Sequence, residues 1–154
     1  MGMPAGIRIG SEDMRTREQQ PAFVPPMLLT SGPVPDGIAW TLEVKWDGCR
    51  VQLRHDRRSV SIRTRNGRDC SDNFPELAAI SEALGKRRVT LDGSWCACAT
   101  TGGSTLRGFG AGSQAAPRNR QPVVLQVFDV LRLDGRSTPA LPYRDRRELL
   151  DELA

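Results

Sequence analysis

The chain has 154 residues, of which 38% are hydrophobic and 26% are charged. This length and balance indicate one globular domain with its own core and argue against a largely disordered chain. The sequence holds no apolar run long enough to cross a membrane, and its N-terminus lacks the apolar stretch of a secretory signal, so we expect a cytoplasmic protein without membrane contact.

The formal net charge is +4, and the positive charge is concentrated in one part of the chain. A basic stripe of this kind suits a polyanion such as nucleic acid or a nucleotide phosphate. A solvated face of an arginine-rich protein explains the same pattern, so the charge does not decide between them. The stripe consists of Arg50, Arg54, Arg57, Arg58, Arg63, Arg65 and Arg68.

The cysteines do not form a recognisable metal or disulfide pattern. Cys96 and Cys98 are separated by one residue, and no second pair lies at zinc-site spacing. The chain has one histidine, His55. We therefore predict that Cys49, Cys70 and the other thiols are reduced and structural, and we assign no metal-binding residue.

The first third of the chain begins without periodic structure. Residues 1–22 are polar and unpatterned, which predicts a disordered lead-in. Phe23–Leu28 is a proline-stiffened extended segment, and Ser31–Gly37 has the composition of a loop.

From Trp40 onward apolar and polar residues alternate, which predicts a strand. Gly48 breaks or bends this strand, and Val51 and Leu53 resume the alternation. On this prediction the apolar face carries Leu42, Val44 and Trp46, and the polar face carries Glu43, Lys45 and Asp47.

A second strand is predicted after a turn at Arg57–Arg58. It covers residues 59–65, with alternating residues facing one side, and the Asn66–Gly67 pair that follows is a turn signal. The residues on the shared face are Val60, Ile62 and Thr64.

A helix is predicted next. Asp72 or Asn73 can cap its N-terminus, Pro75 suits its first turn, and Gly85 can end it. The residues that recur at helical spacing are Phe74, Leu77, Ser81 and Leu84.

The rest of the chain alternates between strands and helices. Residues 87–93 read as a third strand, residues 100–121 as a long loop, and residues 122–133 as a buried strand. Asp134–Gly135 makes a turn, and residues 142–153 form a last helix. The mixed order of elements predicts an α+β domain.

Lys45 is conspicuous because Lys86 is the only other lysine in an arginine-rich chain. Arginine stays protonated and cannot act as an amine nucleophile, whereas a lysine can when its surroundings favour the neutral amine. Glu43 and Asp47 flank Lys45 and could steer its ammonium group or lie near a metal ion. The residues alone also fit an ordinary lysine on a polar strand face, with its flanking carboxylates paired to nearby arginines.

The spacing of these residues resembles a known motif. "EVKWDGCR" fits Glu-x-Lys-x-Asp-Gly-x-Arg, which is similar to the nucleotidyltransferase motif of ATP-dependent DNA ligases and capping enzymes. It looks most like the ligase domains of bacterial end-joining systems, and the resemblance runs in order from Phe23 to Ala154. The further matching segments are "FVPPML", "RTRNGRDCSDNFPEL", "TLDGSWCA" and "VFDVLRLDGRSTPALPYRDRRELL".

The resemblance implies an ATP-grasp-like nucleotidyltransferase (adenylation) domain, with mixed, largely antiparallel sheets and flanking helices. Residues 23–154 would form part of this domain after the lead-in. The chain ends before later motifs of the family and before its OB-fold domain, so we expect a truncated adenylation domain. Such a chain would be the product of a split or degraded gene, or one half of a complex with a chain that supplies the missing motifs.

The same resemblance implies a catalytic role for Lys45. Its amine would attack the α-phosphate of ATP, with Mg²⁺ or Mn²⁺ neutralising the phosphates, and would form a lysyl-adenylate. The adenylate would pass to a 5′-phosphate at a nick in double-stranded DNA during repair. The implied nucleotide-binding residues are Glu43, Arg50 at the ribose or phosphate, Arg65 at phosphate, Ser94, and Phe128 stacked on adenine.

Ser94 departs from the family pattern, because the family has a glutamate there. A serine lacks the charge and the reach of glutamate, and the loss is expected to cost about ten- to a hundredfold in rate or affinity. Asp92 shares the strand face of Ser94 and could compensate in part. The departure favours an alternative, a catalytically inactive pseudo-ligase that binds nucleotide or DNA. An RNA ligase or capping-type transferase is a third interpretation.

Overall fold

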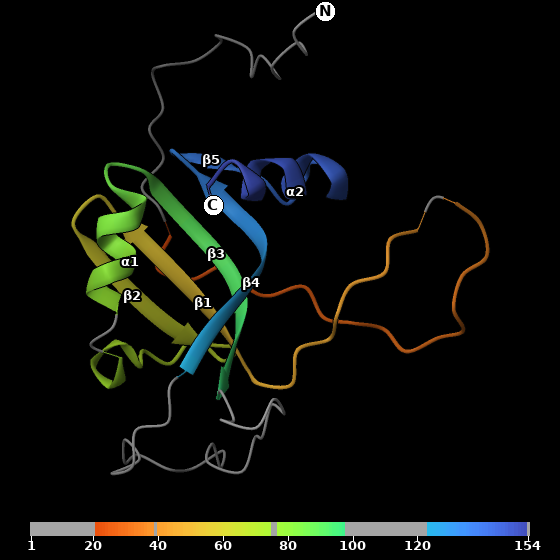
Figure 1. Cartoon of the computed structure of the whole chain (residues 1–154), viewed down its shortest axis with the longest axis horizontal. Helices are drawn as coiled ribbons and strands as arrows, with labels where there is room; N and C mark the ends of the chain where they lie inside the picture. Colours follow the sequence, from red (N-terminus) through yellow and green to blue (C-terminus); the bar gives the residue numbers. More distant parts are fainter. Residues whose placement is uncertain (1–20, 39, 75–76, 98–122, 154) are drawn as a thin grey trace, which may run out of the picture.

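The computed structural model describes residues 21–38, 40–74, 77–97 and 123–153. These residues form five strands in one antiparallel sheet of order β2-β1-β3-β4-β5, together with two α-helices and a 3₁₀ turn (Figure 1). The predicted α+β class with a largely antiparallel sheet is confirmed. Most of the predicted lead-in and the whole predicted loop at 100–121 lie outside the described residues. No helix in the described part of the chain is long and apolar enough to span a membrane.

Strands β1 (Cys49–Asp56) and β2 (Ser59–Thr64) form the predicted hairpin. Leu53 faces Ile62 across the pair, and both side chains are buried. The turn between the strands contains Arg57 at a φ of 58°. The alternation predicted for this part of the chain therefore gave the correct core face.

Strands β3 (Arg88–Ala97) and β4 (Val123–Leu133) form the centre of the sheet, and β5 (Arg136–Ser137) follows a tight turn. A Cβ built on Gly93 would lie 2.7 Å from the carbonyl oxygen of Gln126, so the two strands approach closely at this position. The register shifts beside Gly93, which places Phe128 at an irregular point of β4.

The helices lie where the sequence predicts them, with one shift. A 3₁₀ helix, η1 (Ser71–Asn73), takes up the residues predicted to cap the first helix, and α1 spans Leu77–Leu84. Gly85, at a φ of 57°, ends α1. The predicted first-turn proline, Pro75, lies outside the described residues. Helix α2 spans Tyr143–Asp151 and contacts β4.

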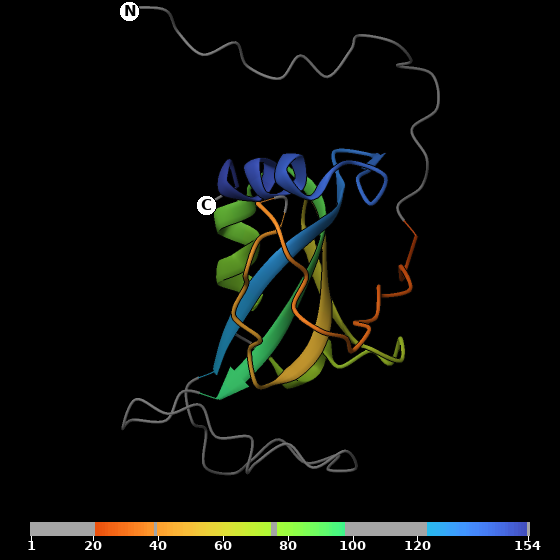
Figure 2. The ribbon, with the colours of Figure 1, turned by 90° about the vertical axis from the view of Figure 1, so that its right-hand side faces the viewer.

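The sheet has an apolar face and a polar face. The apolar face packs against α1 and α2. The polar face carries buried polar side chains, and Figure 2 shows the orange segment before β1 passing over it. Val24 anchors this segment, since both its N–H and its carbonyl hydrogen-bond the side-chain amide of Gln52 at 2.8 Å. The core of the apolar face comprises Val51, Leu53, Ile62, Val89, Leu91, Trp95, Val130, Leu133 and Leu149.

The strand predicted from Trp40 is wrong. Residues 41–47, here called the Lys45 segment, are irregular, and the strand begins only at Cys49. The side chains of Leu42 and Val44 are 89% and 68% exposed. Alternation predicts which side chains share a face, but a strand also needs a neighbour, and no described strand pairs with this segment. Lys45 therefore lies on an exposed irregular segment.

Candidate functional site

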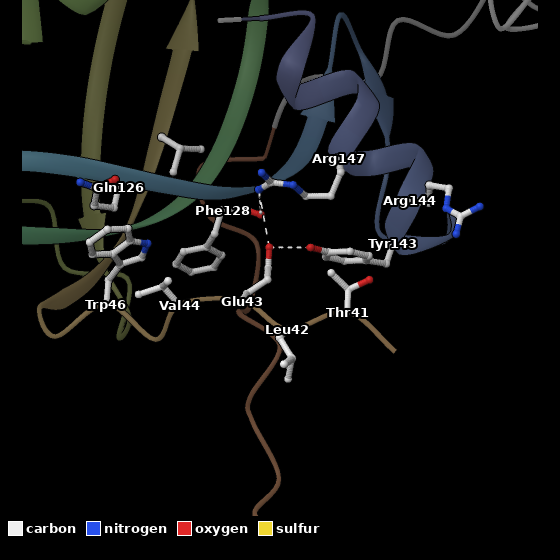
Figure 3. Close-up of a pocket in the computed structure, with 11 residues that line it drawn as sticks. Thr41, Leu42, Glu43, Val44, Trp46, Gln126, Phe128, Tyr143, Arg144 and Arg147 are labelled. Atoms are coloured by element: carbon white, nitrogen blue, oxygen red, sulfur yellow. Dashed lines mark hydrogen bonds and ion pairs between the residues drawn. The ribbon is translucent and has the colours of Figure 1, made fainter. Parts of the chain in front are cut away.

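A pocket of about 580 Å³ lies between the Lys45 segment, β4 and the first turns of α2 (Figure 3). Its position follows from the fold, because β4 presents its irregular stretch toward the segment and α2 begins beside them. The lining residues are Thr41, Leu42, Glu43, Val44, Trp46, Gln126, Val127, Phe128, Tyr143, Arg144 and Arg147.

The Glu43 carboxylate lies at the centre of a polar cluster in this pocket. The hydroxyl of Tyr143 donates a hydrogen bond of 2.6 Å to Glu43 Oε1, and Arg147 Nη1 lies 3.6 Å from the same oxygen. Arg147 Nη1 also donates to the carbonyl oxygen of Phe128 at 3.3 Å. Burial, together with the hydrogen bond and charge of Glu43, raises the pKa of Tyr143 to about 12.

Arg50 and Asp92 form a bidentate ion pair on the polar face of the sheet. Arg50 Nε lies 3.1 Å from Oδ1 of Asp92, and Nη2 lies 2.7 Å from Oδ2. Asp92 is 2% exposed. The hydrogen bonds to Asp92 raise the pKa of Arg50 above its usual value, against the effect of burial. Arg50 Nη1 also donates to the carbonyl oxygen of Met27 at 2.5 Å.

Arg50 also connects this ion pair to the pocket. Its guanidinium carbon lies over the ring of Phe128, 5.5 Å from the ring centroid. This distance is typical of a cation–π contact. Two predicted nucleotide-binding residues, Arg50 and Phe128, are thus adjacent in space.

Ser94 is buried and pairs with Arg50 across β1 and β3. Asp92 has the same parity on β3 and shares its face, as predicted. Both oxygens of Asp92 are bound by Arg50. The carboxylate that was expected to compensate in part for Ser94 therefore already has a partner.

Of the predicted site residues, Glu43 and Phe128 line the pocket, and Lys45, Arg50, Arg65 and Ser94 do not. The side chain of Lys45 is 78% exposed, does not line the pocket, and has its Nζ 3.8 Å from Asp47 Oδ1. Arg65 lies in the turn after β2, where its N–H donates to the carbonyl oxygen of Arg50 at 3.1 Å and its side chain is exposed.

Sequence reasoning missed Tyr143, Arg147 and the engagement of Asp92. It also missed the ion pair that fixes α2 on β4, in which Arg146 Nε lies 2.8 Å from Asp129 Oδ1. The "YRDRR" stretch was available as a signal, since it is unusually basic for the start of a helix, where negative charge is normally favoured.

The described residues contain no group of three or more His, Cys, Asp and Glu side chains that could hold a metal ion. Cys49 and Cys70 are free thiols, and burial raises the pKa of Cys70. The buried thiol of Cys96 contacts the carbonyl oxygen of Ser94. Cys98 lies outside the described residues.

Residues 34–154 match the family described as "ATP dependent DNA ligase domain", and the chain therefore belongs to this family. The predicted resemblance is confirmed. Over 97% of its length, the chain is 36% identical to the multifunctional non-homologous end joining protein LigD of Mycobacterium bovis. Over 74% of its length, it is 37% identical to a probable DNA ligase of Saccharopolyspora erythraea. It spans only about a fifth of either relative, 20% and 22% respectively.

Solved structures agree with this assignment. The ligase domain of LigD from M. tuberculosis superposes with a TM-score of 0.61 at 34% identity, over 72% of this chain and 36% of that one. A mycobacterial DNA ligase D complexed with ATP and MES gives the same TM-score of 0.61 and the same 34% identity, with 35% of that chain covered.

Proposed function

We propose that this chain carries the adenylation step of an ATP-dependent DNA ligase, with Lys45 as the catalytic residue. The observation that supports this most strongly is the position of "EVKWDGCR". In a member of the ligase family, Glu43, Val44 and Trp46 of this motif line a pocket of about 580 Å³ together with Phe128. A related ligase has been solved with ATP bound.

The proposed reaction is a phosphoryl-group transfer onto an amine. The neutral Nζ of Lys45 attacks the α-phosphorus of ATP and forms a phosphorus–nitrogen bond, and the nitrogen loses a proton. The bond from the α-phosphorus to the bridging oxygen breaks, and pyrophosphate leaves. The side chain of Lys45 must turn toward the pocket for this attack. The exposed ion pair with Asp47 opposes that movement only weakly.

The other residues would bind and orient the nucleotide. Phe128 offers a ring for base stacking, and Arg50 is held rigidly beside it by Asp92. Catalysis of this kind depends mostly on positioning and on positive charge around the phosphates. Glu43, Arg65 and Ser94 remain proposed nucleotide contacts.

Mg²⁺ or Mn²⁺ is proposed to arrive with ATP. The described residues offer no clustered ligand set for a metal ion, so we derive no step through a metal held by this chain. Omission of the metal is expected to abolish adenylation, because ATP phosphates need their charge neutralised.

The proposed acceptor is the 5′-phosphate at a nick in double-stranded DNA, within end-joining repair and recombination in the cytoplasm. We also propose a partner polypeptide. It would supply the part of a ligase domain that this chain does not match. The exposed Leu42 and Val44 in a strand-like pattern support it, since they offer an apolar face to a neighbouring strand. Mixing the chain with the remainder of a relative's ligase domain should give a stable complex on size-exclusion chromatography. Separate elution would argue against the partner.

A second candidate function is a pseudo-ligase that binds nucleotide or DNA without catalysis. Ser94 favours it, because the Asp92 carboxylate that could compensate is bound by Arg50. In that case Lys45→Ala would leave salt-dependent DNA binding unchanged, and neither protein would be adenylated.

The test is the intact mass of the chain after incubation with ATP and magnesium. Wild type should gain one adenylate, and Lys45→Ala should gain none. Lys86→Ala serves as the matched control, because it removes the other lysine and should keep the adduct. A folded wild-type chain without the adduct would reject the proposal and leave the binding function.

A further inference from the structure

Two side chains of α2 bind the Glu43 carboxylate, and neither has a role in the function proposed above. The Tyr143 hydroxyl donates to Glu43 Oε1 at 2.6 Å, and Arg147 Nη1 lies 3.6 Å from that oxygen. Figure 3 shows both groups directed from α2 toward Glu43. The contact bridges 100 positions of sequence, so it connects the Lys45 segment with the far end of the chain.

Few backbone or packing contacts fix residues 41–46 of the Lys45 segment. Residues 41–46 make no backbone-to-backbone hydrogen bond with any described residue. Leu42 and Val44 are largely exposed, so packing adds little. A segment without ladder hydrogen bonds or a buried face opens easily, and its remaining side-chain contacts decide where it lies. The Glu43 carboxylate makes the side-chain contacts that hold this part of the segment to α2.

Arg147 joins two walls of the pocket. Its Nη1 faces the Glu43 carboxylate and also donates to the carbonyl oxygen of Phe128. One guanidinium group therefore contacts both the Phe128 wall of the proposed nucleotide site and the segment that carries the proposed nucleophile. A lysine in place of Arg147 would keep the charge but lose the fixed fork of donors.

We infer that Tyr143 and Arg147 are positioning residues, which hold Glu43 and thereby keep the Lys45 segment against the pocket. Their effect on adenylation rests on the proposed function, because it requires Lys45 to be the nucleophile. The tether itself does not depend on it. Tyr143 suits the role, because its hydroxyl donates a hydrogen bond of 2.6 Å to Glu43 Oε1.

The test exploits the two lysines of the chain. A lysine-specific protease can cut only after Lys45 and after Lys86, which is exposed in the turn following α1. Lys86 is thus an internal control for general loosening. In Tyr143→Phe, cleavage after Lys45 should rise by about tenfold, because the variant loses a hydrogen bond to a charged carboxylate. In Arg147→Ala the rise should be smaller, about two- to fivefold, because the ion pair with Glu43 spans 3.6 Å and is partly exposed. Cleavage after Lys86 should not change.

Adenylation gives the second readout. Tyr143→Phe should lower the maximal rate of adenylation by about tenfold and change the half-saturating ATP concentration less, since the tether positions the segment that carries the nucleophile. The adenylation activity of Arg147→Lys should lie between that of wild type and that of Arg147→Ala. Arg58→Ala is the matched control, because this exposed arginine lies in the β1–β2 turn and its loss removes the same charge.

The outcomes separate the two proposals. A rise in the Lys45-to-Lys86 cleavage ratio in both variants supports the tether. An unchanged ratio overturns the tether. Equal acceleration at both sites would mean general loosening of the fold, and no acceleration at either site would mean that the contact does not hold the segment. If wild type forms no adenylate, the proposed function fails, and the cleavage ratio still decides whether Tyr143 and Arg147 position the segment.

Discussion

Replacement of Arg50 by alanine is expected to destabilise the fold far more than replacement of an arginine in a surface ion pair. Asp92 is 2% exposed, and both of its oxygens are bound by Arg50. Breaking a buried pair by removing one partner costs about 3–5 kcal/mol, because it leaves a buried charge uncompensated. The side chain of Arg50 is itself 22% exposed, so we expect the lower end, roughly 3 kcal/mol.

The control is the ion pair of Arg87 with Asp134, at 3.0 Å, in which both side chains are 48% exposed. Exposed pairs contribute about 0–1 kcal/mol, so Arg87→Ala should be nearly neutral. Urea unfolding followed by circular dichroism gives both free energies. Adding Asp92→Asn to Arg50→Ala should recover about 1–2 kcal/mol, because it removes the stranded charge. If Arg50→Ala and Arg87→Ala agree within about 1 kcal/mol, the reasoning about burial is wrong.

Three further predictions concern the pocket and the sheet. Tyr143 is the only tyrosine, so the ultraviolet absorbance of its phenolate titrates it directly. Its pKa should be about 12 and should fall in Glu43→Gln. Because the folded-state pKa is raised, stability should be lost as the pH rises from about 10 through about 12, and a pKa near the ordinary 10.0 would contradict the Glu43 contact. Gly93→Ala should destabilise by about 1–3 kcal/mol in urea, since its Cβ would meet the carbonyl oxygen of Gln126 at 2.7 Å; a neutral effect would refute the close approach. Phe128→Leu should weaken ATP binding by about tenfold in calorimetry, through loss of base stacking, and unchanged affinity would remove Phe128 from the site.

Much of the sheet could be predicted from alternation, because burial has the same period as the strand. Leu53 and Ile62 face the core, and glycines or turn pairs mark the ends of the hairpins. The strand predicted over the Lys45 segment failed, because alternation carries no information about whether a neighbouring strand is present. Its pattern is that of a strand, yet the segment lies exposed.

The fold brings some of the predicted site residues together, and the contacts that they make were not predicted. Glu43 and Phe128 line one pocket, and Arg50 lies over the Phe128 ring, as roles in one site require. The pairing of Arg50 with Asp92 depends on the register of β1 and β3, and the contact of Glu43 with Tyr143 depends on where α2 docks. Both are tertiary facts that no local spacing encodes.

The central claim is that Lys45 accepts adenylate from ATP. The most direct measurement is a peptide map with lysine-specific protease after incubation with α-labelled ATP and magnesium. A modified amine resists this protease, so the account predicts label on one peptide that spans an uncut Lys45, with normal cleavage after Lys86. Label on another residue, or full cleavage after Lys45 in a folded and unlabelled chain, would contradict it.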